Sequence, residues 1–199
     1  GAALVAGYIR DGLKLYMPYK GADTTKGVQF VGTGSTSFDG DNDYVDLGSQ
    51  SGDLRLSGSN GTVMAWVNCS DISGGDSYKR IIDKSDAGSS ENGYAIFVHT
   101  DGKFMTQVNA ETAIASTSTL SVDTWHHVVW TWDGVNQKIY IDGILDKTTA
   151  NTDKPPSDTT SMRIGTWNHT TGREWKGSLK NIAIWNRALT ATEIQNVMY

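Results

Sequence analysis

The segment from Trp125 to Gly143, with the sequence WHHVVWTWDGVNQKIYIDG, decides the fold. Side chains of a β-strand alternate between two faces, so Val128, Trp130 and Trp132 share one face and the residues between them share the other. Apolar residues on both faces predict a strand that is buried on both sides or on most of both. Asp142 and Gly143 predict a tight hairpin turn, because Gly accepts the positive φ that such a turn needs. We therefore interpret this segment as an inner strand pair of a β-sandwich.

The rest of the chain repeats the pattern of short apolar strands and polar turns. A capping box at Thr190–Glu193 predicts one short C-terminal helix, Ala191–Met198, because the Thr hydroxyl and the Glu carboxylate each bind a free backbone N–H. The sequence thus predicts an all-β fold, an antiparallel two-sheet jelly-roll sandwich with that helix. The further strands are expected at 13–17, 28–31, 37–39, 44–47, 62–69, 80–83, 94–99, 103–108, 113–120, 144–149, 161–167 and 179–186.

Composition limits the function classes. The chain has 199 residues, a net charge of −5 and no basic run, which argues against a nucleic-acid partner. No apolar segment is long enough for a membrane-spanning helix, so we expect no membrane insertion. A single cysteine, Cys69, excludes an internal disulfide and is expected to be a small buried apolar residue. We expect residues 1–12 to be a linker or N-terminal extension and residues 13–199 to form one domain.

Three segments, in the same order along the chain, resemble the laminin G-like domains of the concanavalin A-like lectin/glucanase superfamily. The first is FDGDNDYVDL at 38–47, the second is the central WHHVV and KIYIDG pair, and the third is GSLKNIAIWNRALT at 177–190. The resemblance implies a jelly roll of two antiparallel sheets. It also implies a domain that is usually non-catalytic and that often binds Ca²⁺, glycans or proteins.

The acidic turn at Asp39, Gly40, Asp41 and Asp43 is the candidate metal site. Ca²⁺ takes six to eight oxygen ligands, and closely spaced Asp and Asn around Gly supply them. The resemblance pairs Asp39 with Asn181, at a position where the family usually carries Asp or Glu. The sequence therefore predicts a structural Ca²⁺ that ties the first and last strands together; a solvated hairpin turn is the alternative.

Aromatic residues in two Gly-rich loops form the candidate ligand site. A sugar ring can stack on an exposed aromatic side chain while nearby polar side chains bind its hydroxyl groups. Aromatic residues that pack beneath their own loops are the alternative, and this is more common for Trp. The candidate residues are Tyr78, Trp167, Asn168, Arg173 and Trp175.

The sequence argues against catalysis. Retaining glycoside hydrolysis needs two carboxylates about 5 Å apart, whereas the four Glu residues are isolated and the inner strands carry no carboxylate pair. His126 and His127 are adjacent in a strand, so they point to opposite faces and cannot serve one site.

We therefore expect a non-catalytic recognition or adhesion domain that binds a glycan or protein ligand and is located outside the cell, on a cell surface or on a virion. The alternative is a structural or decoration domain of a phage or virus particle or of a surface protein, without sugar binding. A degenerate glycoside hydrolase is the least favoured hypothesis. In each case the chain could belong to a larger polypeptide or assembly.

Overall fold

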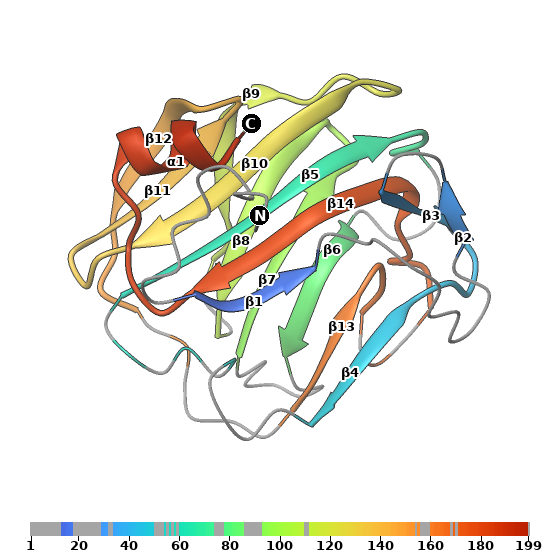
Figure 1. Ribbon diagram of the computed structural model, residues 1–199, viewed down its shortest axis with the longest axis horizontal. Coiled ribbons are helices and arrows are strands. Elements are labelled where there is room, and N and C mark those ends of the chain that lie inside the picture. The colour runs from blue at the N-terminus through green and yellow to red at the C-terminus, as the bar shows by residue number, and fades with distance from the viewer. Residues whose placement is uncertain are drawn as a thin grey trace, which may run out of the picture.

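The computed structural model describes residues 13–17, 29–31, 34–49, 54, 56, 58, 60–73, 78–85, 93–109, 112–153, 155, 160–167, 169 and 171–198. These residues form two packed antiparallel sheets and one helix (Figure 1). The predicted extension at residues 1–12 lies outside the described residues. No helix among the described residues has the length and apolar character needed to cross a membrane.

The first sheet, sheet A, has eight strands within the described residues. Its order is β12 (Ile144–Ala150), β11 (Asn136–Ile141), β10 (Trp125–Trp132), β5 (Gly61–Cys69), β14 (Lys176–Trp185), β3 (Ser35–Asp39) and β2 (Gln29–Val31), and β1 (Leu13–Met17) also pairs with β14. The predicted inner strand pair is confirmed, because β10 lies between β5 and β11, and β11 lies between β10 and β12.

The second sheet, sheet B, has six strands within the described residues and packs behind sheet A (Figure 1). Its order is β4 (Val45–Ser49), β13 (Ser161–Ile164), β6 (Tyr78–Ser85), β7 (Gly93–His99), β8 (Lys103–Val108) and β9 (Ile114–Thr119). The predicted all-β, two-sheet sandwich is thereby confirmed.

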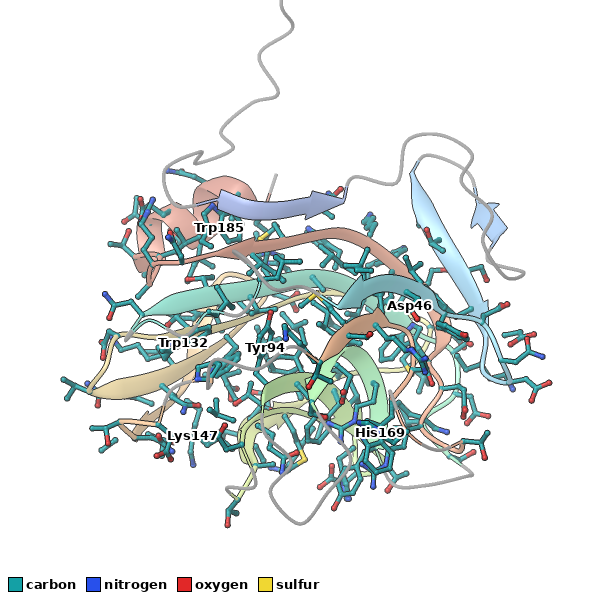
Figure 2. All side chains as sticks on the ribbon, turned by 90° about the horizontal axis from the view of Figure 1, so that it is seen from below. Asp46, Tyr94, Trp132, Lys147, His169 and Trp185 are labelled. Atoms are coloured by element: carbon teal, nitrogen blue, oxygen red, sulfur yellow. The ribbon has the colours of Figure 1, made fainter. Side chains whose placement is uncertain are left out.

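The core between the sheets follows from strand alternation. Trp130 and Trp132 both point inward from β10, are buried, and stack with ring centroids 4.3 Å apart. Tyr94 meets them from β7 of the facing sheet, with its ring 6.3 Å from that of Trp130. Figure 2 shows Tyr94 and Trp132 between the two layers. Cys69 is buried as expected, and burial raises the pKa of its thiol to about 11, so the thiol is not activated.

The C-terminal helix α1 (Ala191–Val197) covers part of the outer face of sheet A. The predicted capping box is present: the Thr190 side chain accepts from the Glu193 backbone N–H, and the Glu193 side chain accepts from the Thr190 backbone N–H. Ile194 and Val197 of the helix pack on Trp185 of the sheet. In Figure 1 the helix lies over the β10–β12 side of the sheet, which leaves the other end of this face without a helix.

His126 and His127 are separated as predicted. His126 Nδ1 lies 2.8 Å from an Asp142 carboxylate oxygen, while Nε2 accepts from the Ser121 backbone N–H. His127 is fully buried, and neither of its ring nitrogens has a hydrogen-bond partner in the described part of the chain. Burial lowers the pKa of His127 to about 4, against the weaker effect of the Asp142 charge.

Gly61 tests the packing of the core. It pairs with Trp132 across β5 and β10, and a Cβ at this position would overlap the indole ring. We expect Gly61→Ala to lower the free energy of unfolding by about 1–3 kcal/mol, because the ring has to move within a packed core. Gly58→Ala is the matched control, since a Cβ there meets no atom within 4 Å. Equal unfolding midpoints for the two variants in a denaturant titration would contradict this packing.

Buried neutral His127 makes stability pH-dependent. Its pKa is lower in the folded state, so the unfolded state binds more protons, and stability is lost as pH falls below 6.5 towards 4. We expect the wild type to lose about 2 kcal/mol more than His127→Phe between pH 7 and pH 5. Urea titrations at the two pH values measure this difference, and parallel losses in both proteins would refute it.

Candidate functional site

A pocket of about 240 Å³ lies where the acidic turn meets the connection between β13 and β14. Asp41, Asn42 and Tyr44 line it from the turn before β4, and Arg163 lines it from β13. The connection contributes Thr166, Trp167, His169, Thr171 and Glu174. In Figure 2, Asp46 and His169 lie towards the same end of the molecule, opposite Lys147. Two segments that sequence analysis treated separately therefore share one pocket.

Backbone hydrogen bonds hold the connection on sheet B. The Gly165 N–H donates to the Ile81 carbonyl of β6, and the Trp175 N–H donates to the Gly165 carbonyl. The second bond joins the two ends of the connection, Gly165 and Trp175. The backbone carbonyl of Arg173 accepts a hydrogen bond from the backbone N–H of Arg80 in β6. Gly165 adopts φ +87°, a conformation that glycine adopts without strain.

Side chains complete this framework. His169 Nε2 lies 2.8 Å from the Ser85 carbonyl, and the Glu174 carboxylate accepts from the Gly172 N–H at 2.7 Å. Trp175, the last residue before β14, is fully buried in the core. The prediction that Trp175 contacts a ligand is therefore wrong: this side chain anchors the connection and presents no face to solvent.

Trp167 and Tyr78 are linked by Arg173. The Arg173 guanidinium lies 3.7 Å from the centroid of the Trp167 ring and 5.2 Å from that of Tyr78. Tyr78 also packs edge-on against Phe97 at 5.4 Å. The structure therefore brings three of the five candidate ligand residues together, although of these three only Trp167 lines the pocket. Asn168 lies outside the described residues.

Arg163 and Tyr44 form the opposite wall. Arg163 lies 4.7 Å above the Tyr44 ring, and its Nε is 3.4 Å from the Asp46 carboxylate, so its charge is partly neutralised. Neither Arg163 nor Tyr44 was predicted from the sequence as a site residue. The signal was present for Arg163, because it alternates with the buried Met162 and Ile164 and must face outwards just before the Trp167 segment.

The acidic turn is held by its own hydrogen bonds. An Asp39 carboxylate oxygen accepts from the Asp41 N–H at 2.8 Å, and an Asp43 oxygen accepts from the Asp39 N–H at 3.0 Å. The pKa of Asp43 is raised, chiefly by burial, and the charges of Asp39 and Asp41 act in the same direction. Gly40 adopts φ +84° and faces the Lys176 side chain.

Asn181 does not join this turn. Asp39 pairs with Lys176, and Asn181 is five residues further along β14, roughly 16 Å away at the rise of a strand. Asn181 instead adopts φ +49° at a bulge in β14, a conformation that Asn tolerates well. Its place in the predicted Ca²⁺ site is therefore wrong. The described residues contain no group of three or more His, Cys, Asp or Glu side chains arranged for a metal ion, so the predicted ligand set does not fit as a set.

Comparisons with known proteins agree with the architecture. A laminin G-type family model, described as the concanavalin A-like lectin/glucanases superfamily, matches residues 39–195. A search of curated protein sequences gives no significant match.

Solved structures with a similar fold include three proteins whose bound sugars are known. A Trypanosoma rangeli sialidase in complex with 2,3-difluorosialic acid has a TM-score of 0.72 at 15% identity, over 94% of this chain and 32% of the sialidase. Domain 4 of AbnA, a GH43 extracellular arabinanase from Geobacillus stearothermophilus, in complex with arabinotriose, has a TM-score of 0.64 at 16% identity, over 83% of this chain and 76% of that one.

The third is the CBM40 of the Ruminococcus gnavus IT-sialidase bound to α2,3-sialyllactose. It has a TM-score of 0.67 at 12% identity, over 83% of this chain and 96% of that one. The chain thus spans about a third of the first sialidase but nearly all of the CBM40. At these identities the likeness shows the fold alone.

Proposed function

The chain belongs to the concanavalin A-like lectin/glucanase superfamily, and we propose that it is a non-catalytic carbohydrate-recognition domain. The observation that carries the proposal is the pocket between the acidic turn and the Trp167 connection. There two aromatic side chains, each held by an arginine, stand beside side chains that can bind hydroxyl groups.

This arrangement matches the chemistry of a sugar ring, which has apolar C–H faces and hydroxyl groups around its edge. The Trp167 and Tyr44 rings offer apolar surface, and Asp41, Asn42 and Glu174 offer hydrogen-bonding groups. A volume of about 240 Å³ is below the roughly 300–1,000 Å³ of most drug-sized ligand sites. The pocket therefore suits a short unit such as a single sugar ring at the end of a chain.

The charges of the pocket favour an uncharged sugar. Asp41 and Glu174 are acidic, and Arg163 is already paired with Asp46. The carboxylate of an acidic sugar would be repelled by the negative charges of Asp41 and Glu174, while the positive charge of Arg163 is already shared with Asp46. The named structures support carbohydrate binding in general, since one is a complex with arabinotriose and another with sialyllactose. The arabinotriose complex, with its neutral sugar, is the closer chemical parallel.

The non-catalytic part of the proposal rests on what the pocket carboxylates already do. The buried Glu174 accepts from the Gly172 N–H and so fixes the connection, while Asp41 is exposed on the turn. We propose that the domain lies outside the cell or on its surface, and its likeness to a domain of the extracellular arabinanase AbnA supports this location. The activity of any longer protein that contains it is a separate question.

One observation favours the alternative, a structural or adhesive domain. Ile144 and Leu145 of the edge strand β12 are 70% and 51% exposed, which suits a protein contact better than a sugar. The two functions are distinguished by sugar binding, which a purely structural domain lacks.

Trp167 tests the proposed pocket. We expect Trp167→Ala to weaken binding of the best neutral pentose or hexose oligosaccharide in a screening panel by about tenfold or more, because a central aromatic contact is lost. Leu145→Ala, which also removes a large exposed apolar side chain, is the control that should bind like the wild type. Isothermal titration calorimetry measures both affinities. Unchanged affinity in the Trp167 variant, or no binding across the panel, would reject the pocket.

Calcium binding at the acidic turn stays a prediction. Asp39, Asp41 and Asp43 do not form a three-carboxylate group arranged for a metal ion in the described structure, so the proposed ligands are at most two of these carboxylates together with nearby backbone carbonyl groups. A cation there would offset the mutual repulsion that contributes to the raised pKa of Asp43. We expect a chelator to lower the thermal unfolding midpoint of calcium-loaded protein, because an ion that binds only the folded state stabilises it. Asn181→Ala should show the same chelator response as the wild type. If a chelator leaves the thermal unfolding midpoint of the calcium-loaded wild type unchanged, the prediction of a stabilising calcium ion is wrong.

A further inference from the structure

The outer face of sheet A carries a second group of aromatic residues, far from the pocket in sequence and on the other sheet. Trp125 in β10 pairs with Asn68 in β5, and one step along the sheet Trp66 in β5 pairs with Lys180 in β14. Strand alternation places these side chains on the face of sheet A opposite the core. None of them belongs to the buried cluster that Ile194 and Val197 of α1 form on this face. All four are partly exposed.

The Lys180 ammonium lies close to both indole rings. Its nitrogen is 4.2 Å from the centroid of Trp125 and 5.2 Å from that of Trp66. Such contacts orient the cation, but ring faces accept no conventional hydrogen bond from its three N–H groups. We name Trp66, Trp125 and Lys180 the tryptophan–lysine platform.

The charge of Lys180 has no carboxylate partner within the described part of the chain. Two carboxylates on neighbouring segments are engaged elsewhere: Asp71 pairs with Lys176 at 3.4 Å, and Asp142 binds His126 and the His127 N–H. His127, which stacks on Trp66 at 5.3 Å, is neutral because burial lowers its pKa to about 4. The platform therefore presents one oriented positive charge flanked by apolar rings.

We infer that the tryptophan–lysine platform is a second carbohydrate site, selective for sugars that carry a carboxylate or sulfate. The anionic group accepts from the Lys180 ammonium, and the sugar ring contacts the adjacent indoles. A charge-assisted bond of this kind is about twice as strong as a neutral one. The charge preference is opposite to that of the acidic pocket, and the inference does not depend on the pocket binding anything.

Lactose and two anionic derivatives of it test the platform: 3′-sulfolactose adds a sulfate group alone, and 3′-sialyllactose adds a sialic acid residue with its carboxylate. The 199-residue protein is titrated calorimetrically with lactose, 3′-sulfolactose and 3′-sialyllactose. At low salt we expect at least one of the two anionic sugars to bind about tenfold or more tightly than lactose. Tighter binding of only one of them identifies sulfate or carboxylate as the preferred group. This preference should weaken as salt is added.

Variants assign the binding to the platform. Lys180→Gln should weaken binding of the anionic sugar about tenfold. Lys180→Arg keeps the positive charge and should retain most of the affinity for that sugar. Leu145→Ala, which lies outside both the pocket and the platform, should leave anionic binding unchanged. The pocket is tested by Trp167→Ala with a neutral sugar and the platform by Lys180→Gln with an anionic one, so failure of the pocket and failure of the platform give different results. Unfolding midpoints confirm that the variants fold. Equal affinity for all three sugars, or unchanged anionic binding in Lys180→Gln, would overturn the inference.

Discussion

The burial of Trp175 between the two sheets is the constraint on which the proposed pocket depends. Its side chain lies in the core at the point where β14 begins, and its backbone N–H closes the 165–175 segment through the Gly165 carbonyl. With both ends of the segment fixed, Arg173 can hold Trp167 at the rim beside the acidic turn. The buried Trp175 therefore fixes the connection, while the partly exposed Trp167 lines the pocket.

Much of the fold could be predicted from sequence because its signals are local. Alternating apolar residues, Asp-Gly turns and the capping box at Thr190 each report the conformation of a few neighbouring residues, and the structure confirms them. The family motifs then supplied the global arrangement that local signals cannot give. The sandwich and the position of β10 within its sheet follow from the two together.

The sites were predicted only in part because they depend on contacts between distant segments. Sequence alone could not tell which tryptophan of the 165–175 segment packs inward, so Trp175 was placed wrongly beside Trp167. Asn181 lies five residues beyond Lys176, the partner of Asp39 on β14, and is therefore too far along the strand to reach the turn that motif order assigned it to. The strand of Trp125 was expected to be buried on both sides or on most of both, because both of its faces carry apolar residues, and Trp66 was not singled out. In fact α1 covers only part of that outer face, and these two side chains remain partly exposed.

Two faces of one sandwich therefore differ in charge: the pocket carries Asp41 and Glu174, and the platform carries Lys180. The most direct test of the central claim is an NMR titration of the seven tryptophan indole N–H signals with a neutral oligosaccharide. If the pocket recognises carbohydrate, the Trp167 signal shifts, while the signals of the buried Trp130, Trp132, Trp175 and Trp185 stay in place. A saturable titration that leaves Trp167 unmoved would contradict carbohydrate recognition at the pocket.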